Sequence, residues 1–391
     1  MAVKKKDKKK KSDDGNDDPG LNPSALLTNY TKFCRHVCIA ANQKIVNILS
    51  REESAELFVK TKQLIIDDEF GPLKASGTRA LCTALMGSGP GGSKVPCRLL
   101  KHLRLWRCEV GDDGCACIAE LLRLGGAEVA ITYLELLDND VAFEGARYLG
   151  RALAFGQNKS LLTLKLDYNR SLGSDGVKAL CEGLRTNSSL RQLHLPYCEI
   201  DENGAAPLAE MLTYRLLGLT SLNLQGNQLA GKGLADLCEG LKVNTSLTSL
   251  SIADNGIGQC DAQALATFAE VLMSPTSGLV AVDMLYNRIG TKGGDAMLTV
   301  FGGIKTPAKI KHLMIDSTLP DNLFDCLCRI PVSFFICVVF IFSHRRRAAR
   351  AARKRRKKEG PRRKSREASF FCQISIMTVL LLFQKSRVVC T

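Results

Sequence analysis

LTSLNLQGNQLAGKGLADLCEGLKVN, residues 219–244, is the most regular stretch of the chain. Its first half follows the order L-x-x-L-x-L-x-x-N-x-L, with these positions held by Leu219, Leu222, Leu224, Asn227 and Leu229. Its second half has apolar residues at the spacing of one helix face, namely Leu234, Leu237, Cys238 and Leu241. The stretch predicts a strand followed by a helix, and such a unit can bury its apolar side only against copies of itself.

Copies of this unit recur along the chain at intervals of 28 to 32 residues. Seven of them begin at Leu100, Ile131, Leu161, Leu190, Leu219, Leu247 and Leu279, with a degenerate copy near Gln63 and an eighth strand at Ile310. The position of Asn227 is held in the other units by Cys108, Asn139, Asn169, Cys198, Asn255 and Asn287. We expect these side chains to face inward and to satisfy backbone groups that would otherwise be buried without a partner.

A unit of this length, with a full helix and with Asn or Cys at the turn, resembles the ribonuclease-inhibitor type of leucine-rich repeat. The resemblance covers about residues 61–320. This family includes ribonuclease inhibitor, the sensor arm of NOD-like receptors and Ran GTPase-activating protein. The resemblance implies an α/β horseshoe solenoid with a parallel sheet on its inner, concave face and helices outside. It also implies that the protein binds other proteins.

Changes in composition divide the chain into four predicted parts. Residues 1–20 are a run of lysines and aspartates, for which we expect a disordered arm. Residues 21–60 have helical periodicity and are the candidate N-terminal cap that covers the first core layer of the solenoid. The solenoid of about eight units occupies residues 61–327, and a tail of apolar and basic residues follows at 328–391.

The net charge of +15 comes mainly from one block, residues 345–366, in which Glu359 is the one acidic residue. The repeats themselves are close to neutral, which gives nucleic-acid binding by the repeat body no electrostatic support. Sixteen cysteines without a C-x-x-C pair, behind an N-terminus without an apolar segment, favour free thiols and a cytoplasmic location. Three of the five N-x-S/T sequons recur just after the repeat helix, which indicates a turn preference of the repeat; they begin at Asn158, Asn187 and Asn244.

The tail leaves three interpretations open. Residues 330–342 are an apolar run that is shorter than the about 20 residues of a membrane-spanning helix. Together with the basic block 345–366, this run would serve as a membrane anchor, with the positive charge on the cytosolic side. Alternatively, the basic block is a nuclear or nucleic-acid signal. In the third interpretation, the sequence after about residue 325 is an artefact of gene prediction, because the eighth unit breaks off there.

The candidate binding residues lie between and beyond the core leucines of each strand, on the face opposite the core. The single tryptophan and three of the seven tyrosines fall at these positions, and aromatic residues beside arginine are typical of protein-binding hot spots. The small or polar residues of the 219–244 unit are expected to bind least. The predicted protein-binding residues are Arg104, Trp106, Arg107, Glu135, Asp138, Lys165, Asp167, Tyr168, His194, Tyr197, Asp254, Asp283 and Tyr286.

No hydrolase, metalloprotease or dinucleotide-binding motif is found in the sequence, so we expect no catalytic residues, cofactor, metal or small-molecule substrate. The prediction is a protein-interaction scaffold with a protein partner on the concave face. The alternatives are a regulator of a small GTPase, similar to Ran GTPase-activating protein, and a membrane-tethered adaptor. The expected location is cytoplasmic, and the alternative is a membrane-associated or nuclear location through the basic tail.

Overall fold

The computed structural model describes residues 19–89, 94–126, 128–154, 156–303 and 310–315. The predictions for the charged arm up to residue 18, for the end of the solenoid after Ile315 and for the tail 328–391 lie outside these residues.

Nine parallel strands form one sheet, in which each strand pairs with the next strand along the chain. This arrangement confirms the predicted parallel sheet of a leucine-rich repeat horseshoe. The strands are β1 (Gln63–Ile66), β2 (His102–Trp106), β3 (Tyr133–Leu137), β4 (Thr163–Lys165), β5 (Gln192–His194), β6 (Ser221–Asn223), β7 (Ser249–Ser251), β8 (Ala281–Met284) and β9 (His312–Ile315).

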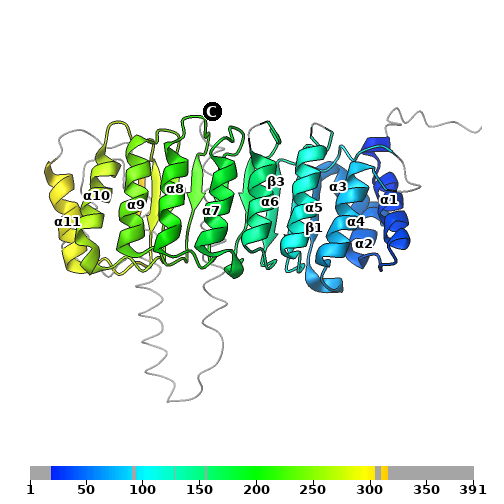
Figure 1. Ribbon diagram of the computed structural model, residues 1–391, viewed down its shortest axis with the longest axis horizontal. Helices are drawn as coiled ribbons and strands as arrows, with labels where there is room; N and C mark the ends of the chain where they lie inside the picture. Colours follow the sequence, from blue (N-terminus) through cyan, green and yellow to red (C-terminus); the bar gives the residue numbers. More distant parts are fainter. Residues whose placement is uncertain (1–18, 90–93, 127, 155, 304–309, 316–391) are drawn as a thin grey trace, which may run out of the picture. The chain divides into compact units, whose positions relative to one another are not determined.

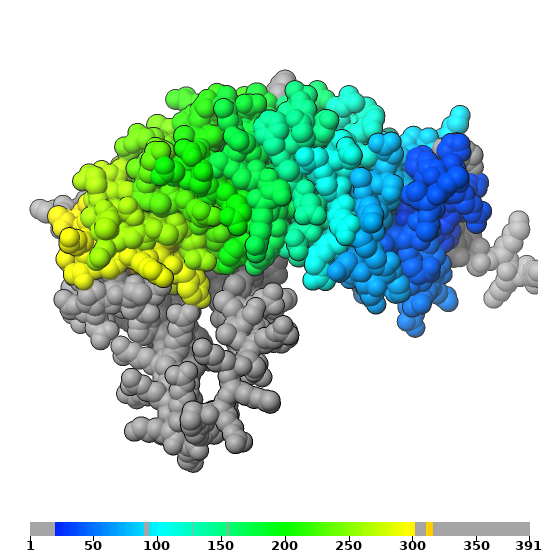
Figure 2. All heavy atoms as spheres, turned by 60° about the horizontal axis from the view of Figure 1, so that its bottom comes forward, coloured from blue at the N-terminus to red at the C-terminus, as the bar shows by residue number. Residues whose placement is uncertain are grey.

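One helix follows each of the strands β1 to β8, and these helices form a layer on one face of the sheet (Figure 1). They are α4 (Lys74–Met86), α5 (Gly111–Leu124), α6 (Phe143–Leu153), α7 (Gly173–Leu184), α8 (Ala205–Thr213), α9 (Ala230–Val243), α10 (Ala262–Met273) and α11 (Gly290–Gly303). Short 3-10 helices lie between some strands and helices, namely η2 (Asp68–Phe70), η3 (Arg170–Leu172), η4 (Glu202–Gly204) and η5 (Gln259–Asp261). The space-filling view shows the units packed in chain order, from the blue helices to the yellow α11 (Figure 2). Within the described residues, none of the helices is long and apolar enough to cross a lipid bilayer.

Before β1 the chain forms η1 (Pro19–Leu21), α1 (Pro23–His36), α2 (Gln43–Ser50) and α3 (Glu52–Thr61). Helix α1 begins where Asn22 caps it, since the Asn22 side chain accepts a hydrogen bond from the Ser24 N–H and Pro23 occupies the first turn. Tyr30 and Phe58 of these helices are fully buried and belong to the same hydrophobic core as the repeats. The Tyr30 hydroxyl accepts from the Asn42 N–H at 3.0 Å, which joins α1 to the start of α2.

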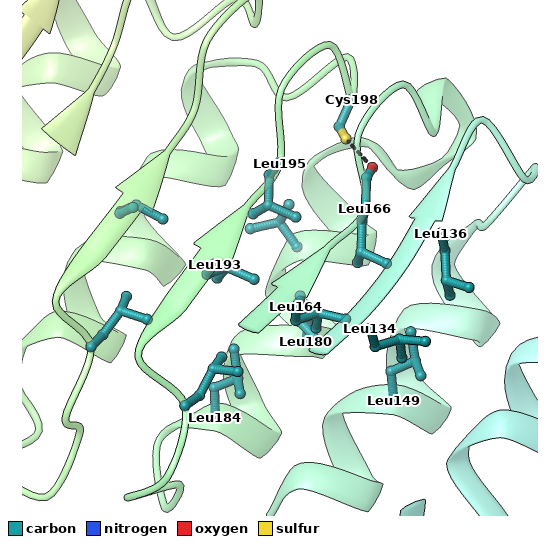
Figure 3. Packing of buried hydrophobic residues seen from close by; sticks show 14 of the residues in the cluster. Leu134, Leu136, Leu149, Leu164, Leu166, Leu180, Leu184, Leu193, Leu195 and Cys198 are labelled. Carbon is teal, nitrogen blue, oxygen red and sulfur yellow. Dashed lines mark hydrogen bonds between the residues drawn. The ribbon is translucent and has the colours of Figure 1, made fainter. Parts of the chain in front are cut away.

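The hydrophobic core lies between the sheet and the helix layer (Figure 3). In the centre of the chain, Leu164 and Leu193 of neighbouring strands lie near Leu180 and Leu184 of α7, and all four side chains are fully buried. Each fully buried leucine contributes roughly 1.5–3 kcal/mol relative to an exposed one. The helical spacing of the apolar residues in the sequence therefore corresponds to the face that packs against the sheet.

The inward-facing Asn and Cys side chains form a hydrogen-bonded ladder along one edge of the sheet, as predicted. The Asn227 amide nitrogen donates to the Leu195 and Leu224 carbonyls at 2.9 and 2.8 Å, and its oxygen accepts from the Cys198 N–H at 3.0 Å. The Cys198 thiol in turn donates to the Leu166 carbonyl at 3.1 Å (Figure 3). Each side chain thus bonds to the backbone of the preceding unit and sets the spacing between units.

A second set of buried asparagines lies at the helix ends, and it explains the sequons. The amide nitrogens of Asn158, Asn187 and Asn244 donate to the last helix carbonyls of the preceding unit at 2.7–2.8 Å. Their oxygens accept from the N–H that precedes the next strand, at 2.7–2.9 Å. All five sequon asparagines are at most 8% exposed. The interpretation of the recurring sequons as a turn feature is therefore confirmed.

Replacing Cys198 with alanine should lower the free energy of unfolding by about 1–2 kcal/mol, because the Leu166 and Pro196 carbonyls lose the thiol donor. Cys198→Asn should cost less than half as much, since asparagine makes the same contacts in other units. Chemical denaturation of the two variants measures the difference. Cys260→Ala, at an exposed cysteine, is the control and should leave the midpoint unchanged. Equal losses for Cys198→Ala and Cys198→Asn would contradict the ladder interpretation.

Candidate protein-binding face

The concave face is here the face of the sheet that points away from the helix layer. The strand register places one row of side chains across this face, in which each residue pairs with the next. The row agrees with the alignment predicted from the sequence. It consists of Arg104, Glu135, Lys165, His194, Asn223, Ser251, Asp283 and Met314. A neighbouring row, two residues earlier in each strand, contains His102, Tyr133, Thr163, Gln192, Ser221, Ser249, Ala281 and His312. The sequence analysis did not include this second row.

Glu135 is the centre of a hydrogen-bonded group on this face. The Trp106 indole N–H donates to Glu135 Oε1 at 3.1 Å, and the Tyr133 hydroxyl donates to Glu135 Oε2 at 2.6 Å. Arg104 Nε lies 3.5 Å from the same carboxylate, and its guanidinium carbon lies 4.8 Å from the Tyr133 ring centre. Burial, together with the hydrogen bond to the Glu135 carboxylate, raises the pKa of Tyr133, so the hydroxyl remains a donor at neutral pH. Two aromatic side chains are thereby fixed in place on the concave face.

Tyr133 is the functional candidate that sequence reasoning missed. It lies two residues before Glu135 on β3, so strand alternation places both side chains on the same face. The Tyr133 side chain contacts Glu135 and Arg104. Its ring centre also lies 5.8 Å from Lys165 Nζ and 5.5 Å from the centre of the His102 ring. The period of two would have identified Tyr133 if the row before the first core leucine had been read as well.

Asp167 and His194 lie next to this group in a partly buried environment. Burial raises the pKa of Asp167 to about 6; the Glu135 carboxylate acts in the same direction, and Lys165 opposes it. Asp167 Oδ1 is buried and has no hydrogen-bond partner among the described residues. Burial, with a smaller effect of Lys165, lowers the pKa of His194 to about 3, so that the imidazole is neutral at pH 7. At neutral pH the Asp167 carboxylate is therefore ionised, and the cation that acts on it is Lys165.

A third row lies where the chain leaves each strand, and it has left-handed backbone conformation in every described unit from β2 to β8. The φ angles are +52° to +63° at six of the predicted residues: Arg107, Asp138, Tyr168, Tyr197, Asp254 and Tyr286. Gly226 holds the same position after β6, with φ +71°. Side chains other than glycine are disfavoured in this region, and tyrosine lacks the local hydrogen bonding with which aspartate compensates. The three tyrosines at such positions are therefore candidates for a functional role.

Tyr168 and Tyr197 of this row form an aromatic platform that crosses three units. Their rings stack, with centres 4.7 Å apart and planes at 16°. The Tyr197 ring extends over Gly226, where an added Cβ would overlap the ring. Gln225 Nε2 donates to the Tyr197 hydroxyl at 3.3 Å. Because Gly226 has no side chain, it leaves room for the Tyr197 ring. Its own unit, residues 219–244, was expected to contribute least to binding.

The thirteen predicted residues are not all brought together. Arg107 pairs with Asp68 at 2.8 Å, at the N-terminal side of the face. Asp254, Asp283 and Tyr286 belong to the β7 and β8 units, three and four strands beyond the Tyr168 unit. Asp283 accepts a hydrogen bond from the Leu285 N–H at 3.0 Å, and burial raises its pKa. The compact part of the candidate site is therefore the β2–β6 half of the face. The described residues hold no group of three or more His, Cys, Asp or Glu side chains arranged to bind a metal ion.

The parallel sheet, the single helix layer and the Asn/Cys ladder define a leucine-rich repeat solenoid. The family model described as "Leucine Rich repeat" matches the chain at residues 97–119, 157–181, 186–209, 219–238 and 243–266. The repeats of this chain are similar to those of leucine-rich repeat proteins of the ribonuclease-inhibitor type. Proteins of this kind generally serve as scaffolds for protein–protein interaction.

The similar curated proteins have diverse names. Ribonuclease inhibitor of Sus scrofa is 32% identical over 204 residues, covering 52% of this chain and 41% of the inhibitor. The Homo sapiens NACHT, LRR and PYD domains-containing protein 13 is 32% identical over 183 residues, covering 46% and 17% of the two chains. The Protein phosphatase 1 regulatory subunit 37 homolog of Caenorhabditis elegans is 29% identical over 190 residues, covering 44% and 20%. The chain spans less than half the length of each of these relatives.

Proposed function

We propose that this protein is a non-catalytic scaffold that binds a protein partner on the β2–β6 half of its concave face. The observation that carries the proposal is the pair of aromatic side chains, Trp106 and Tyr133, held by one carboxylate on the open face of the sheet. Relatives with an inhibitor and a regulatory subunit among their names support a function through binding.

The hydrogen bonds of Glu135 fix the orientation of both rings before any partner arrives. Side chains that are already ordered lose less conformational entropy on association, so more of their contact energy contributes to affinity. Trp, Tyr and Arg are the residues that most often dominate binding energy, and Arg104 completes such a set here. The exposed side chains of the third row, among them Asp138 and Tyr168, would form the polar and aromatic rim of the interface.

Replacing Trp106 with alanine should reduce partner binding about tenfold or more, because hot-spot truncations cost at least 1–2 kcal/mol. To measure this, a photo-crosslinking amino acid replaces Asp138, which is exposed beside the concave face. The full-length protein is then crosslinked in cell extract. The proteins that position 138 crosslinks in the native protein should no longer be crosslinked when the protein also carries Trp106→Ala. Tyr214→Ala removes an exposed aromatic side chain at the end of α8 and should leave the crosslinked set unchanged.

A second crosslinker position separates the two faces of the solenoid. Arg123 is exposed on α5, in the helix layer, and should not capture the proteins that position 138 captures. Capture of the same proteins from position 123, or capture from position 138 that is insensitive to Trp106→Ala, would refute binding on the concave face.

A further inference from the structure

Asp167 is not needed by the repeat itself. The equivalent positions in the β2, β3 and β5–β8 units hold the uncharged residues Trp106, Leu137, Pro196, Gln225, Ala253 and Leu285. The β1 unit holds Asp67, but that carboxylate has a partner, since it pairs with Lys44 at 3.2 Å. The fold therefore accepts apolar and neutral residues at this position, and aspartate must be explained by something other than packing.

The carboxylate of Asp167 is also costly where it stands. One of its oxygens is buried without a hydrogen-bond partner among the described residues, and an unsatisfied buried acceptor is unfavourable, more so when it carries charge. Lys165 acts on Asp167 through its charge, but the two form no ion pair within the described part of the chain, where Lys165 Nζ lies 5.8 Å from the Tyr133 ring centre. A cationic group from outside would remove this cost if the carboxylate turned its buried oxygen toward the open face, where the residue is partly exposed.

The residue that follows supplies the second half of a recognition site. Tyr168 is 41% exposed and is stacked on Tyr197, so its ring is held in place from one side. A guanidinium group binds a carboxylate through two hydrogen bonds and stacks on an aromatic ring, whereas an ammonium group lacks the planar shape for both contacts.

The charge of the surrounding edge favours the same class of ligand. Asp138, Asp140, Glu199 and Asp254 are exposed along this edge, while Lys165 and Arg170 are cations of the Asp167 unit itself. The acidic excess attracts basic segments and contributes to the rate of association.

We propose that the partner inserts an arginine side chain at the C-terminal end of β4, on the concave face. There its guanidinium pairs with the Asp167 carboxylate and stacks on the Tyr168 ring. This inference rests on the proposed function and specifies the chemistry of the partner segment. A helix of the partner or an extended basic peptide would present such a side chain equally well.

The test is selection of random heptapeptides displayed on phage against the immobilised full-length protein, at physiological salt. The expected result is enrichment of arginine at one peptide position. The affinity of a selected synthetic peptide, measured by fluorescence anisotropy, should fall about tenfold or more on Asp167→Asn or Tyr168→Ala. Tyr168→Phe keeps the ring and should keep the affinity within about twofold. Asp295→Asn removes an exposed aspartate of α11 and should leave the affinity unchanged.

Replacing the arginine of the peptide by lysine should also weaken binding severalfold, and equal affinity of the two peptides would contradict recognition by stacking. Peptides without arginine, or binding that is insensitive to Asp167→Asn, would overturn this inference. If such peptides still depend on Trp106, the concave face remains the binding surface and the arginine site alone is refuted. Selected peptides that depend on neither residue would count against both proposals.

Discussion

Replacing Asn169 with leucine should lower the free energy of unfolding by about 4 kcal/mol, the largest effect we expect from a single substitution in the ladder. Asn169 is 1% exposed, and its oxygen accepts from the N–H groups of Asn139 and Val141 at 2.9 and 3.0 Å. Its amide nitrogen donates to the carbonyls of Leu136 and Leu166, both at 2.8 Å. Leucine would fill the space but leave several buried backbone groups without a partner, each at a cost of about 1–3 kcal/mol.

Denaturation in urea, followed by circular dichroism, measures this loss. Asn169→Cys should fall between leucine and the native residue, because a thiol still donates to the carbonyls, as Cys198 does. Asn203→Leu is the control, since Asn203 is exposed and its side chain bonds only to Asp201 among the described residues; it should change stability by less than about 0.5 kcal/mol. A leucine variant as stable as the native protein would show that the ladder does not hold the units together.

The sequence was sufficient to predict the fold because the same pattern of residues occurs in several units. The strand and helix spacings, and the Asn or Cys at the turn, each recur in several copies, so that an irregular copy does not obscure the pattern. Strand alternation was also sufficient to align Arg104 with Glu135 and the following residues of their row.

The arrangement of side chains within the site could not be predicted in the same way. Trp106 and Glu135 are 29 residues apart, and whether an indole reaches a neighbouring carboxylate depends on rotamers that the repeat pattern does not specify. The stack of Tyr168 on Tyr197, and the extension of Tyr197 over Gly226, likewise follow from local packing between units. The repeat pattern fixes which residues share a face, whereas the contacts between them come from residues that differ from unit to unit.

Asp167 connects the stability of the protein with its proposed function. A carboxylate whose pKa rises from 3.8 to about 6 on folding favours the folded state less when it is ionised. The folded protein binds more protons than the unfolded chain between these two values, so the free energy of unfolding falls as pH rises from about 4 to about 6. The shift corresponds to about 3 kcal/mol, which is lost fully above pH 6. Natural proteins retain such costs where binding requires them.

Replacing Asp167 with asparagine should therefore stabilise the protein by about 2–3 kcal/mol at pH 7.5 and by almost nothing at pH 4, because asparagine carries no charge at either pH. Urea denaturation at the two pH values measures the difference. The neighbouring charges, Glu135 and Lys165, remain in place, so the change is due to Asp167 alone. Asp138→Asn removes an exposed carboxylate from the adjacent unit and should alter stability little at either pH. A stabilisation that is equal at both pH values would mean that the Asp167 carboxylate is not destabilised by its surroundings, and the main reason to assign it a cationic ligand would disappear.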